Sequence, residues 1–387
     1  MYNILTLNNI SKKGLNLFGA GYNCSSDIKL PDAILVRSQS MHEMPFDNSI
    51  LAVARAGAGV NNIPVEKCSE NGTVVFNTPG ANANAVKELV LVGLLISSRK
   101  IYNGIKWVES LKGQNELVGK MVEKGKSSFA GPELKGKKLG VIGLGAIGVL
   151  VANAALCLGM EVFGYDPYIS IDSAWGLSSK VKHSFSMEKI FSNCDYITMH
   201  VPLSPDTENM INSESIRLMK NGVRILNFSR GGLVSNKDIV DAVKSGKVMS
   251  YVTDFPSDDL IGVDGIITIP HLGASTPESE ENCSIMAVNQ LKDYLENGNI
   301  VNSVNMPNIS MARDGGTRIC VLHKNIPNII SSVSGVLSSN SVNIENMSSK
   351  SRNAYAYAIL DVTGDVSEDT IRKIYNIDGV IRTRIII

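Results

Sequence analysis

The sequence predicts an α/β protein in which parallel strands with crossover helices are followed by a smaller unit of mixed pattern. Three observations support this prediction. Apolar runs of strand length alternate with helical segments, a strand leads into a glycine-rich turn and a helix at 137–159, and the pattern changes beyond residue 316. We therefore expect a Rossmann-type sheet together with at least one further domain.

Nine apolar runs are predicted as β-strands in chain order. They cover 32–38, 50–57, 72–79, 137–145, 160–167, 194–202, 223–232, 248–255 and 265–273. Helical segments separate them, which is typical of parallel strands joined by crossover helices. A long helical region begins at 82–101 and leads into the polar, Gly- and Lys-rich stretch 111–131, where we expect the chain to cross between domains.

The C-terminal part has a different order of elements. After the helical segment 280–299, the stretch 301–316 is rich in Asn, Gly and Pro and has neither helical nor strand periodicity. The strand-like runs that follow are 317–324, 343–351, 354–364 and 379–387, and 325–342 and 367–378 are helical. This order predicts a compact βαββαβ unit.

Composition narrows the classes of function. A chain of 387 residues exceeds what one hydrophobic core usually organises, so two or three domains are expected. Its formal net charge of +0 gives no attraction to nucleic acid or anionic membrane, and a small-molecule partner is favoured. The apolar run 89–96 is too short to span a bilayer, and the N-terminus lacks the order of a signal peptide. We expect a cytoplasmic protein.

The cysteines show no pattern of a disulfide framework or a metal site. No CxxC pair and no companion histidine spacing is present, so we expect reduced thiols and no bound metal. The six are Cys24, Cys68, Cys157, Cys194, Cys283 and Cys320.

The motif KLGVIGLGAIG predicts a dinucleotide site. Gly143 permits a tight turn, Gly145 a close approach of a pyrophosphate to the backbone, and Gly148 close packing of helix on strand. The next strand-like run ends on Asp166, where a carboxylate accepts hydrogen bonds from ribose hydroxyls and repels a 2′-phosphate. Asp166 therefore favours NAD over NADP. The alternative for a lone GxGxxG is a simple glycine-rich turn, but strand, turn, helix, strand and Asp in this order favour dinucleotide binding.

Three groups beyond this motif are candidates for proton and substrate handling. Arg230, before two glycines at a strand end, is able to bind a substrate carboxylate; the alternative is a surface ion pair. His271, in IPHLGAST, is a candidate general acid/base or else a hydrogen-bonded core histidine. One of Asp254, Asp258 and Asp259 is expected to pair with this histidine, unless all three form a solvated acidic loop.

These motifs resemble a known family. KLGVIGLGAIG with YDP, NFSRGG and IPHLGAST in this order are similar to the D-isomer-specific 2-hydroxyacid dehydrogenases over nearly the whole chain. RAGAGVNNIP, FNTPGANANAV and HLGASTPESEENC resemble most closely the branch that oxidises D-3-phosphoglycerate with NAD. The resemblance implies Arg230, Asp258 and His271 as the catalytic set, with His271 as the general acid/base.

The resemblance also implies a division of the chain. A flavodoxin-like, split substrate domain would comprise 1–98 and 283–310, and an NAD-binding Rossmann domain would comprise 99–282. A regulatory ACT domain would cover 316–387. The implied cofactor contacts, besides the motif residues, are Ala146, Ile147, Val201, Pro202, Phe228, Asp254 and Gly273.

The implied substrate contacts include cations for the phosphate. Arg55, in RAGAGV, matches a substrate-contacting arginine of the family, and Lys126, in EKGKSSF, lies where relatives carry a basic residue. The backbone of the FNTPG segment, from Asn77 to Gly80, would bind the substrate carboxylate.

One segment departs from the family pattern of Asp-Val-Phe followed by Glu-Pro. Aligned on Phe255, the catalytic Glu becomes Asp258 and the Asp that binds the nicotinamide amide becomes Thr253. Asp254 takes that second role if the alignment shifts by one residue. A shorter carboxylate still favours the imidazolium form of a neighbouring histidine.

The tail resembles an ACT domain, a module that often binds amino acids between paired copies. His323, Asn325 and Asn343 match positions that contact L-serine in serine-inhibited relatives, but Asn328 replaces the family's usual glycine. The resemblance therefore implies a homo-oligomer, dimer or tetramer, with L-serine as effector. The alternative is an oligomerisation module without an effector.

Two other functions stay open on the sequence alone. The chain could reduce or oxidise an unphosphorylated D-2-hydroxy acid, in which case removing the phosphate from the substrate would not abolish turnover. It could also be an NAD-sensing binding protein without catalysis, although its neutral charge and its ACT-like tail give that function no support.

Overall fold

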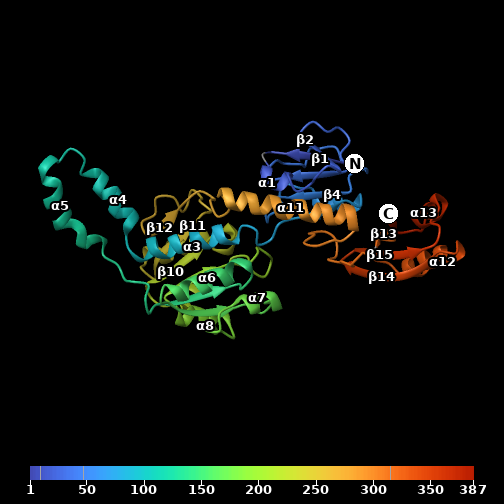
Figure 1. The fold of residues 1–387 in the computed structure, drawn as a ribbon. Coiled ribbons are helices and arrows are strands. Elements are labelled where there is room, and N and C mark those ends of the chain that lie inside the picture. Colours follow the sequence, from blue (N-terminus) through green and yellow to red (C-terminus); the bar gives the residue numbers. More distant parts are fainter. Residues whose placement is uncertain (9, 47, 314) are drawn as a thin grey trace. The chain divides into compact units, whose positions relative to one another are not determined.

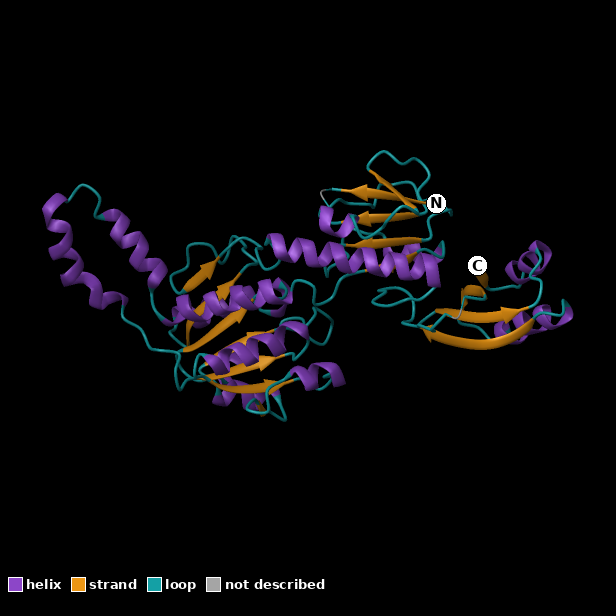
Figure 2. Cartoon of the chain, in the orientation of Figure 1, coloured by secondary structure: helices purple, strands orange, loops and turns teal. Residues whose placement is uncertain are grey.

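The computed structural model describes residues 1–8, 10–46, 48–313 and 315–387. The chain forms two compact units, of which the first joins Met1–Asn82 to Pro277–Ile387 and the second comprises Ala83–Thr276. Each unit has its own sheets, drawn as orange arrows in Figure 2. None of the described helices is both long and apolar enough to cross a membrane.

The second unit contains a seven-stranded sheet in the order β12-β11-β10-β9-β6-β7-β8. Its recorded pairings are all parallel. From the central pair β6 and β9, the strands continue outward as β7 and β8 on one side and as β10, β11 and β12 on the other. This is the doubly wound order of a Rossmann sheet, the fold that the sequence predicted. The strands are β6 (Lys138–Ile142), β7 (Glu161–Tyr165), β8 (Lys182–His183), β9 (Tyr196–Met199), β10 (Val223–Asn227), β11 (Val248–Thr253) and β12 (Ile266–Thr268).

The helices of this unit cover its sheet (Figure 1). They are α3 (Ala83–Ser98), α6 (Ala146–Cys157), α7 (Ile171–Gly176), α8 (Met187–Asn193), α9 (Ser213–Leu218) and α10 (Asn236–Lys244), with the 3₁₀ turn η3 (Gly231–Leu233). Val86, Val90 and Leu94 of α3 pack in the same core as Leu139 and Val141 of β6. For this reason α3 belongs to the second unit, whereas the sequence prediction placed residues up to 98 with the first.

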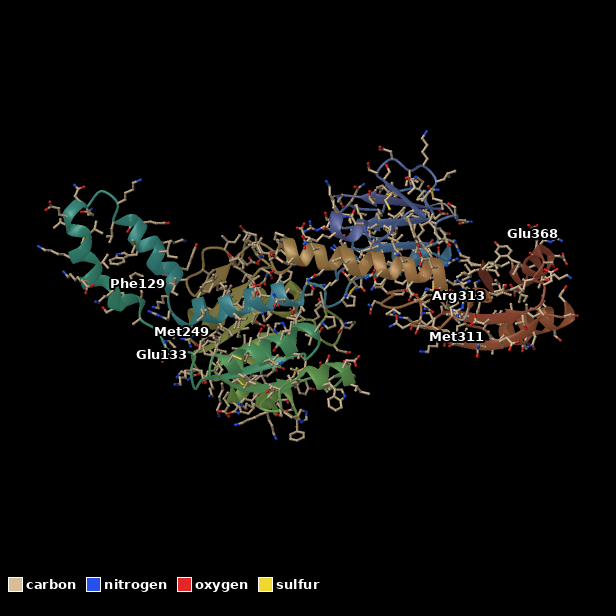
Figure 3. The ribbon with its side chains drawn as sticks, viewed as in Figure 1. Phe129, Glu133, Met249, Met311, Arg313 and Glu368 are labelled. Carbon is tan, nitrogen blue, oxygen red and sulfur yellow. The ribbon has the colours of Figure 1, made fainter. Side chains whose placement is uncertain are left out.

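A helical hairpin lies between α3 and β6. It consists of α4 (Ile101–Ser110), η1 (Asn115–Leu117), α5 (Val118–Gly125) and η2 (Lys126–Phe129). Figure 3 labels Phe129, whose ring centroid lies 5.2 Å from that of Trp107 across the hairpin. Neither α4 nor α5 has a buried residue. The stretch 111–131, expected as a crossing between domains, is thus largely helical.

The first unit contains a five-stranded parallel sheet in the order β2-β1-β3-β4-β5, which confirms the flavodoxin-like arrangement. Ala287, Leu291 and Tyr294 of the long helix pack in one core with Ile4 and Phe76 of the strands. The elements are β1 (Tyr2–Leu7), α1 (Lys12–Leu15), β2 (Tyr22–Ser25), β3 (Ala33–Val36), β4 (Ala52–Arg55), α2 (Val65–Glu70), β5 (Val74–Phe76) and α11 (Pro277–Asn297).

The C-terminal residues form the predicted βαββαβ unit, with an antiparallel sheet in the order β14-β15-β13-β16. Arg318, fully buried, donates to the carbonyl of Asn297 at 2.8 Å and pairs with Asp361 at 2.6 Å. The bond to Asn297 links the sheet to α11 within the first unit. The elements are β13 (Thr317–Lys324), α12 (Ile329–Ser339), β14 (Asn343–Arg352), β15 (Tyr355–Thr363), α13 (Glu368–Tyr375) and β16 (Val380–Ile386).

Candidate active site

The glycine-rich turn follows β6 in the second unit. Gly143 has φ +89°, and a Cβ on it would lie 2.6 Å from the carbonyl oxygen of His200. A Cβ on Gly148 would lie 1.9 Å from the carbonyl oxygen of Gly143, so both positions require glycine for backbone packing. A Cβ on Gly145 would meet nothing within 4 Å. The space beside Gly145 is therefore open to a ligand.

Helix α6 begins at this open position. Gly145 is its N-cap and supplies no side-chain hydrogen bond, and both Gly145 and Ala146 are exposed. The amides of the first turn, among them those of Ala146 and Ile147, are left for an external acceptor. Such an end favours an anion, so these residues fit the pyrophosphate of a dinucleotide.

Asp166 lies beside the turn because two backbone amides hold it. Its Oδ2 accepts from the amide of Leu144 at 2.8 Å and its Oδ1 from that of Tyr168 at 2.8 Å. Each carboxylate oxygen keeps further lone pairs for a hydroxyl donor. The position at the end of β7 is the one at which a ribose is bound in a Rossmann fold.

A histidine that the sequence reasoning missed lies on the other side of the turn. His200 follows β9, and its Nε2 lies 3.0 Å from Oγ1 of Thr198. Burial lowers the pKa of His200 to about 3, so its imidazole is neutral at ordinary pH. The predicted cofactor contacts Val201 and Pro202 come directly after it. The position of His200 directly after a predicted strand was the feature of the sequence that could have identified it.

Arg230 is exposed at the end of the segment that follows β10, and buried polar groups fix its backbone. The Nδ2 of Asn227, which is fully buried, donates to the carbonyl of Arg230 at 2.9 Å. Oδ1 of the same amide accepts from the backbone N–H of Ser229 at 3.2 Å. Sequence reasoning missed Asn227 and Ser229. Phe228, a predicted cofactor contact, has its side chain in the core against α3.

Asp254 is the buried acid at the end of β11. It is 0% exposed, and its Oδ2 accepts from the backbone N–H of Gly273 at 3.3 Å. Burial raises the pKa of Asp254, and the charges of His271 and Arg230 oppose that shift. His271 is exposed, and its ring centroid lies 4.8 Å from that of Phe255. The structure thus brings together Arg230, Asp254 and His271 at the ends of three neighbouring strands.

Asp258 and Asp259 lie in the turn after β11, and both are exposed. Neither carboxylate has a hydrogen bond or ion pair to another residue in the part of the chain that the structure describes. Thr253 is buried, and its Oγ1 accepts from the backbone N–H of Phe255 at 3.1 Å. The pairing of Asp258 with His271 stays a prediction.

The predicted substrate contacts belong to both units. Arg55, Asn77 and Gly80 lie in the first, and Lys126 lies in the second. The Nε of Arg55 donates to a backbone carbonyl at 3.0 Å, and Gly80 has φ +82°. Lys126, on the hairpin, is exposed and ion-paired with Glu123. Their roles stay predictions.

Two of the three predicted effector residues share a pocket in the C-terminal sheet. His323 and Asn325 line a cavity of about 300 Å³, together with Asn328, which has φ +69°. Nδ1 of His323 donates to the carbonyl of Lys324 at 2.7 Å, which leaves its buried Nε2 without a partner. Burial lowers the pKa of His323. Asn343, at the opposite end of β14, does not line this cavity.

Comparison with known proteins accounts for this arrangement. Residues 92–273 match the NAD binding domain of the D-isomer specific 2-hydroxyacid dehydrogenases. The chain is 31% identical over 356 residues to a D-3-phosphoglycerate dehydrogenase of Haemophilus influenzae, covering 87% of this chain and 81% of that protein. The chain belongs to the D-isomer specific 2-hydroxyacid dehydrogenase family. It is therefore an NAD-dependent oxidoreductase, and the fit of the glycine turn to a dinucleotide agrees with that cofactor.

Other members of the family match over different lengths. The chain is 36% identical over 297 residues to a D-3-phosphoglycerate dehydrogenase of Methanocaldococcus jannaschii, with 74% of this chain aligned and only 54% of that longer relative. The NAD⁺-bound 3-phosphoglycerate dehydrogenase structure from Entamoeba histolytica superposes with a TM-score of 0.60 at 25% identity, covering 79% of this chain and 98% of that one.

Proposed function

We propose that the chain oxidises D-3-phosphoglycerate to 3-phosphohydroxypyruvate with NAD⁺, the first step of the phosphorylated route to L-serine. The observation that carries this proposal is the meeting of Arg230, Asp254 and His271 at the carboxyl ends of β10, β11 and β12, the edge at which doubly wound sheets bind ligands. We place the reaction in the cytoplasm, where the six cysteines, all free, would stay reduced.

The residues have separate tasks in the proposed reaction. NAD⁺, when bound, supplies the acceptor for the hydride that leaves C2 of the substrate. His271 takes the proton of the C2 hydroxyl, for which its exposed ring is accessible. Arg230 binds the C1 carboxylate and stabilises the oxygen that becomes a carbonyl. A carboxylate, Asp258 by family position or Asp254 by burial, favours the imidazolium that forms on His271.

The phosphate of the substrate needs cations beyond Arg230. We assign this task to Arg55 and Lys126, and we assign binding of the carboxylate end to the backbone amides between Asn77 and Gly80. Lys126 would exchange its exposed partner Glu123 for the phosphate, an exchange of low cost because surface ion pairs contribute about 0–1 kcal/mol. Asp166 would select NAD over NADP by repelling a 2′-phosphate.

The first experiment measures oxidation of NADH by the purified full-length chain with 3-phosphohydroxypyruvate, and separately with hydroxypyruvate. Rapid turnover that requires the phosphate is the expected result. Equal or faster turnover of the unphosphorylated acid would replace the proposal by a general D-2-hydroxy acid dehydrogenase. Binding of NADH without turnover of either acid would indicate a binding protein.

We further propose that the C-terminal βαββαβ unit is an ACT domain that binds L-serine. His323 and Asn325 share a cavity, and the buried Nε2 of His323 has no hydrogen-bond partner in the described part of the chain. Because Asn343 lies at the far end of its strand, it would have to reach this ligand from a second copy of the chain. L-serine is expected to inhibit the wild type and to inhibit His323→Ala at least about tenfold more weakly. Equal inhibition of both would exclude this site.

We propose that the chain forms a homo-oligomer through the hairpin of α4 and α5. Neither helix buries a residue within the chain, and apolar side chains such as Ile105, 53% exposed, and Val108, 50% exposed, face outward. Exposed apolar patches of this kind mark protein interfaces. Ile105→Asp should lower the mass measured by sedimentation, whereas Lys106→Asp, which changes a polar position, should not. An unchanged mass for Ile105→Asp would refute this interface.

A further inference from the structure

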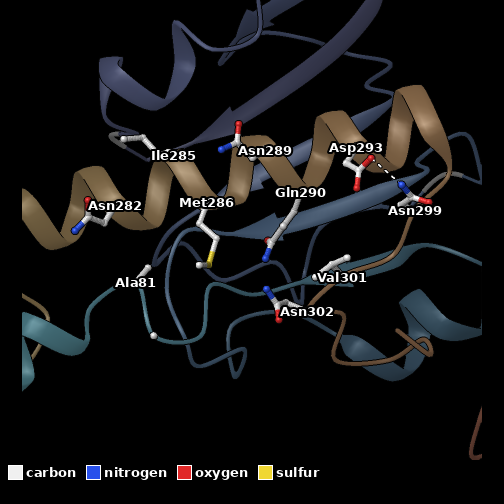
Figure 4. Close-up of a pocket in the computed structure, with 11 residues that line it drawn as sticks. Ala81, Asn282, Ile285, Met286, Asn289, Gln290, Asp293, Asn299, Val301 and Asn302 are labelled. Atoms are coloured by element: carbon white, nitrogen blue, oxygen red, sulfur yellow. Dashed lines mark hydrogen bonds between the residues drawn. The ribbon is translucent and has the colours of Figure 1, made fainter. Parts of the chain in front are cut away.

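The first unit contains a cleft beneath α11, of whose lining residues only Gly80 has a task in the proposed reaction. Its volume of about 660 Å³ lies in the range of small-molecule sites. Three segments of the same unit line it, namely α11, the turn at 80–81 and the loop at 299–302 (Figure 4). The cleft is therefore complete within one unit.

Gln290 is the polar group that points to a ligand. Its residue is only 8% exposed, yet neither its Nε2 nor its Oε1 has a hydrogen-bond partner. Buried amides in folded proteins are almost always paired, because an unpaired donor or acceptor loses its bonds to water without replacement. Figure 4 shows Gln290 and Met286 pointing from α11 toward the segment that carries Asn302.

The other lining groups define the charge of a ligand. No lysine, arginine or histidine is among them, and the one ionisable side chain is that of Asp293, whose Oδ1 accepts from Nδ2 of Asn299 at 3.0 Å. A phosphate or carboxylate would meet an acidic group and no cation here. The phosphorylated substrate is therefore a poor occupant, and an uncharged ligand is favoured.

The shape of the polar contact defines the ligand further. A glutamine amide offers a donor and an acceptor in one plane, which pair with the acceptor and donor of another carboxamide. Ala81, Met286 and Val301 supply apolar surface next to Gln290. We propose that this cleft binds an uncharged molecule whose carboxamide pairs with Gln290 and whose apolar body lies against Met286 and Val301.

Benzamide is the probe for this site, and benzoate, which has the same ring and a negative charge, is its matched control. The full-length chain, saturated with NAD⁺ so that the cofactor site is filled, is labelled with ¹³C at its methionine methyl groups. The Met286 resonance, assigned by Met286→Leu, is expected to shift on titration with benzamide and to remain unchanged with benzoate.

Two variants test the contacts. Gln290→Leu removes the amide and keeps an apolar side chain of similar size, and Asn302→Gly removes the facing amide while tolerating the φ of +60° at that position. Binding to Gln290→Leu should weaken about tenfold or more, because two hydrogen bonds are lost. Glu278→Gln, an exposed change on the same helix outside the cleft, should bind benzamide as the wild type does.

These outcomes test the cleft and not the proposed dehydrogenase reaction, because the experiment measures binding of benzamide and not turnover of NAD⁺. No shift of Met286 with benzamide would overturn it. So would benzoate binding as tightly as benzamide, or unchanged benzamide affinity in both Gln290→Leu and Asn302→Gly. A shift confined to the wild type and to Glu278→Gln would support it.

Discussion

Asn227→Ala tests whether a buried amide sets the position of Arg230. The wild-type amide, fully buried, donates to the carbonyl of Arg230 at 2.9 Å and accepts from the N–H of Ser229 at 3.2 Å. Alanine removes these two bonds and a third, from Nδ2 to the Tyr251 hydroxyl at 3.4 Å. The carbonyl of Arg230 keeps the bond from the N–H of Leu233 at 3.3 Å, whereas the N–H of Ser229 loses its partner, at about 1–3 kcal/mol if it stays buried. Loss of the bond to Tyr251 adds about 1 kcal/mol. We expect the free energy of unfolding to fall by about 2–4 kcal/mol. Loss of a fixed Arg230 should lower kcat/KM by about 100-fold.

Two measurements separate these effects. Urea unfolding gives the change in stability, and steady-state NAD⁺ reduction at a temperature well below the variant's transition gives kcat/KM for protein that is fully folded. Asn16→Ala, an exposed asparagine in the first unit, should change neither quantity by much. If Asn227→Ala keeps wild-type kcat/KM while losing stability, Asn227 is a folding residue only and does not position Arg230.

Three further predictions concern the same unit. Burial raises the pKa of Asp254, so its ionised form destabilises the folded state at pH values above the pKa of the unfolded state. Asp254→Asn should therefore melt at a higher temperature than the wild type near neutral pH, and the two melting temperatures should converge in acid. The same variant should lose at least about tenfold in activity. Gly145→Ala should keep the wild-type melting temperature and lose NAD⁺ affinity in a fluorescence titration, whereas Gly148→Ala should be destabilised because its Cβ would lie 1.9 Å from a backbone oxygen. His200 has a pKa of about 3 in the folded state against an ordinary 6.5, so between these values only the unfolded state binds a proton at this residue. Wild-type stability therefore falls as the pH falls. Between about pH 7 and pH 4, the melting temperature of His200→Gln should fall by less than that of the wild type.

Local patterns were sufficient where strands are buried on both faces. The nine predicted runs all form strands, because a central parallel strand needs apolar residues throughout, as in the fully buried Ala33–Val36 and Tyr196–Met199. The strands Tyr2–Leu7, Tyr22–Ser25 and Lys182–His183 of the parallel sheets were not predicted. The second of these is an edge strand without a fully buried residue, so its sequence carries little apolar signal.

The sequence by itself determined the alternation of strands and helices in the nucleotide unit, its glycine turn and the presence of an arginine and a histidine at strand ends, because each follows from short-range patterns that a strand, turn or helix imposes on neighbouring residues. Only the tertiary structure decided that Asp254 is buried while Asp258 is exposed, that Asn227 holds the backbone of Arg230, and that Gln290 is buried without a partner. Burial and pairing depend on which distant segments pack together, and no local pattern of residues records that.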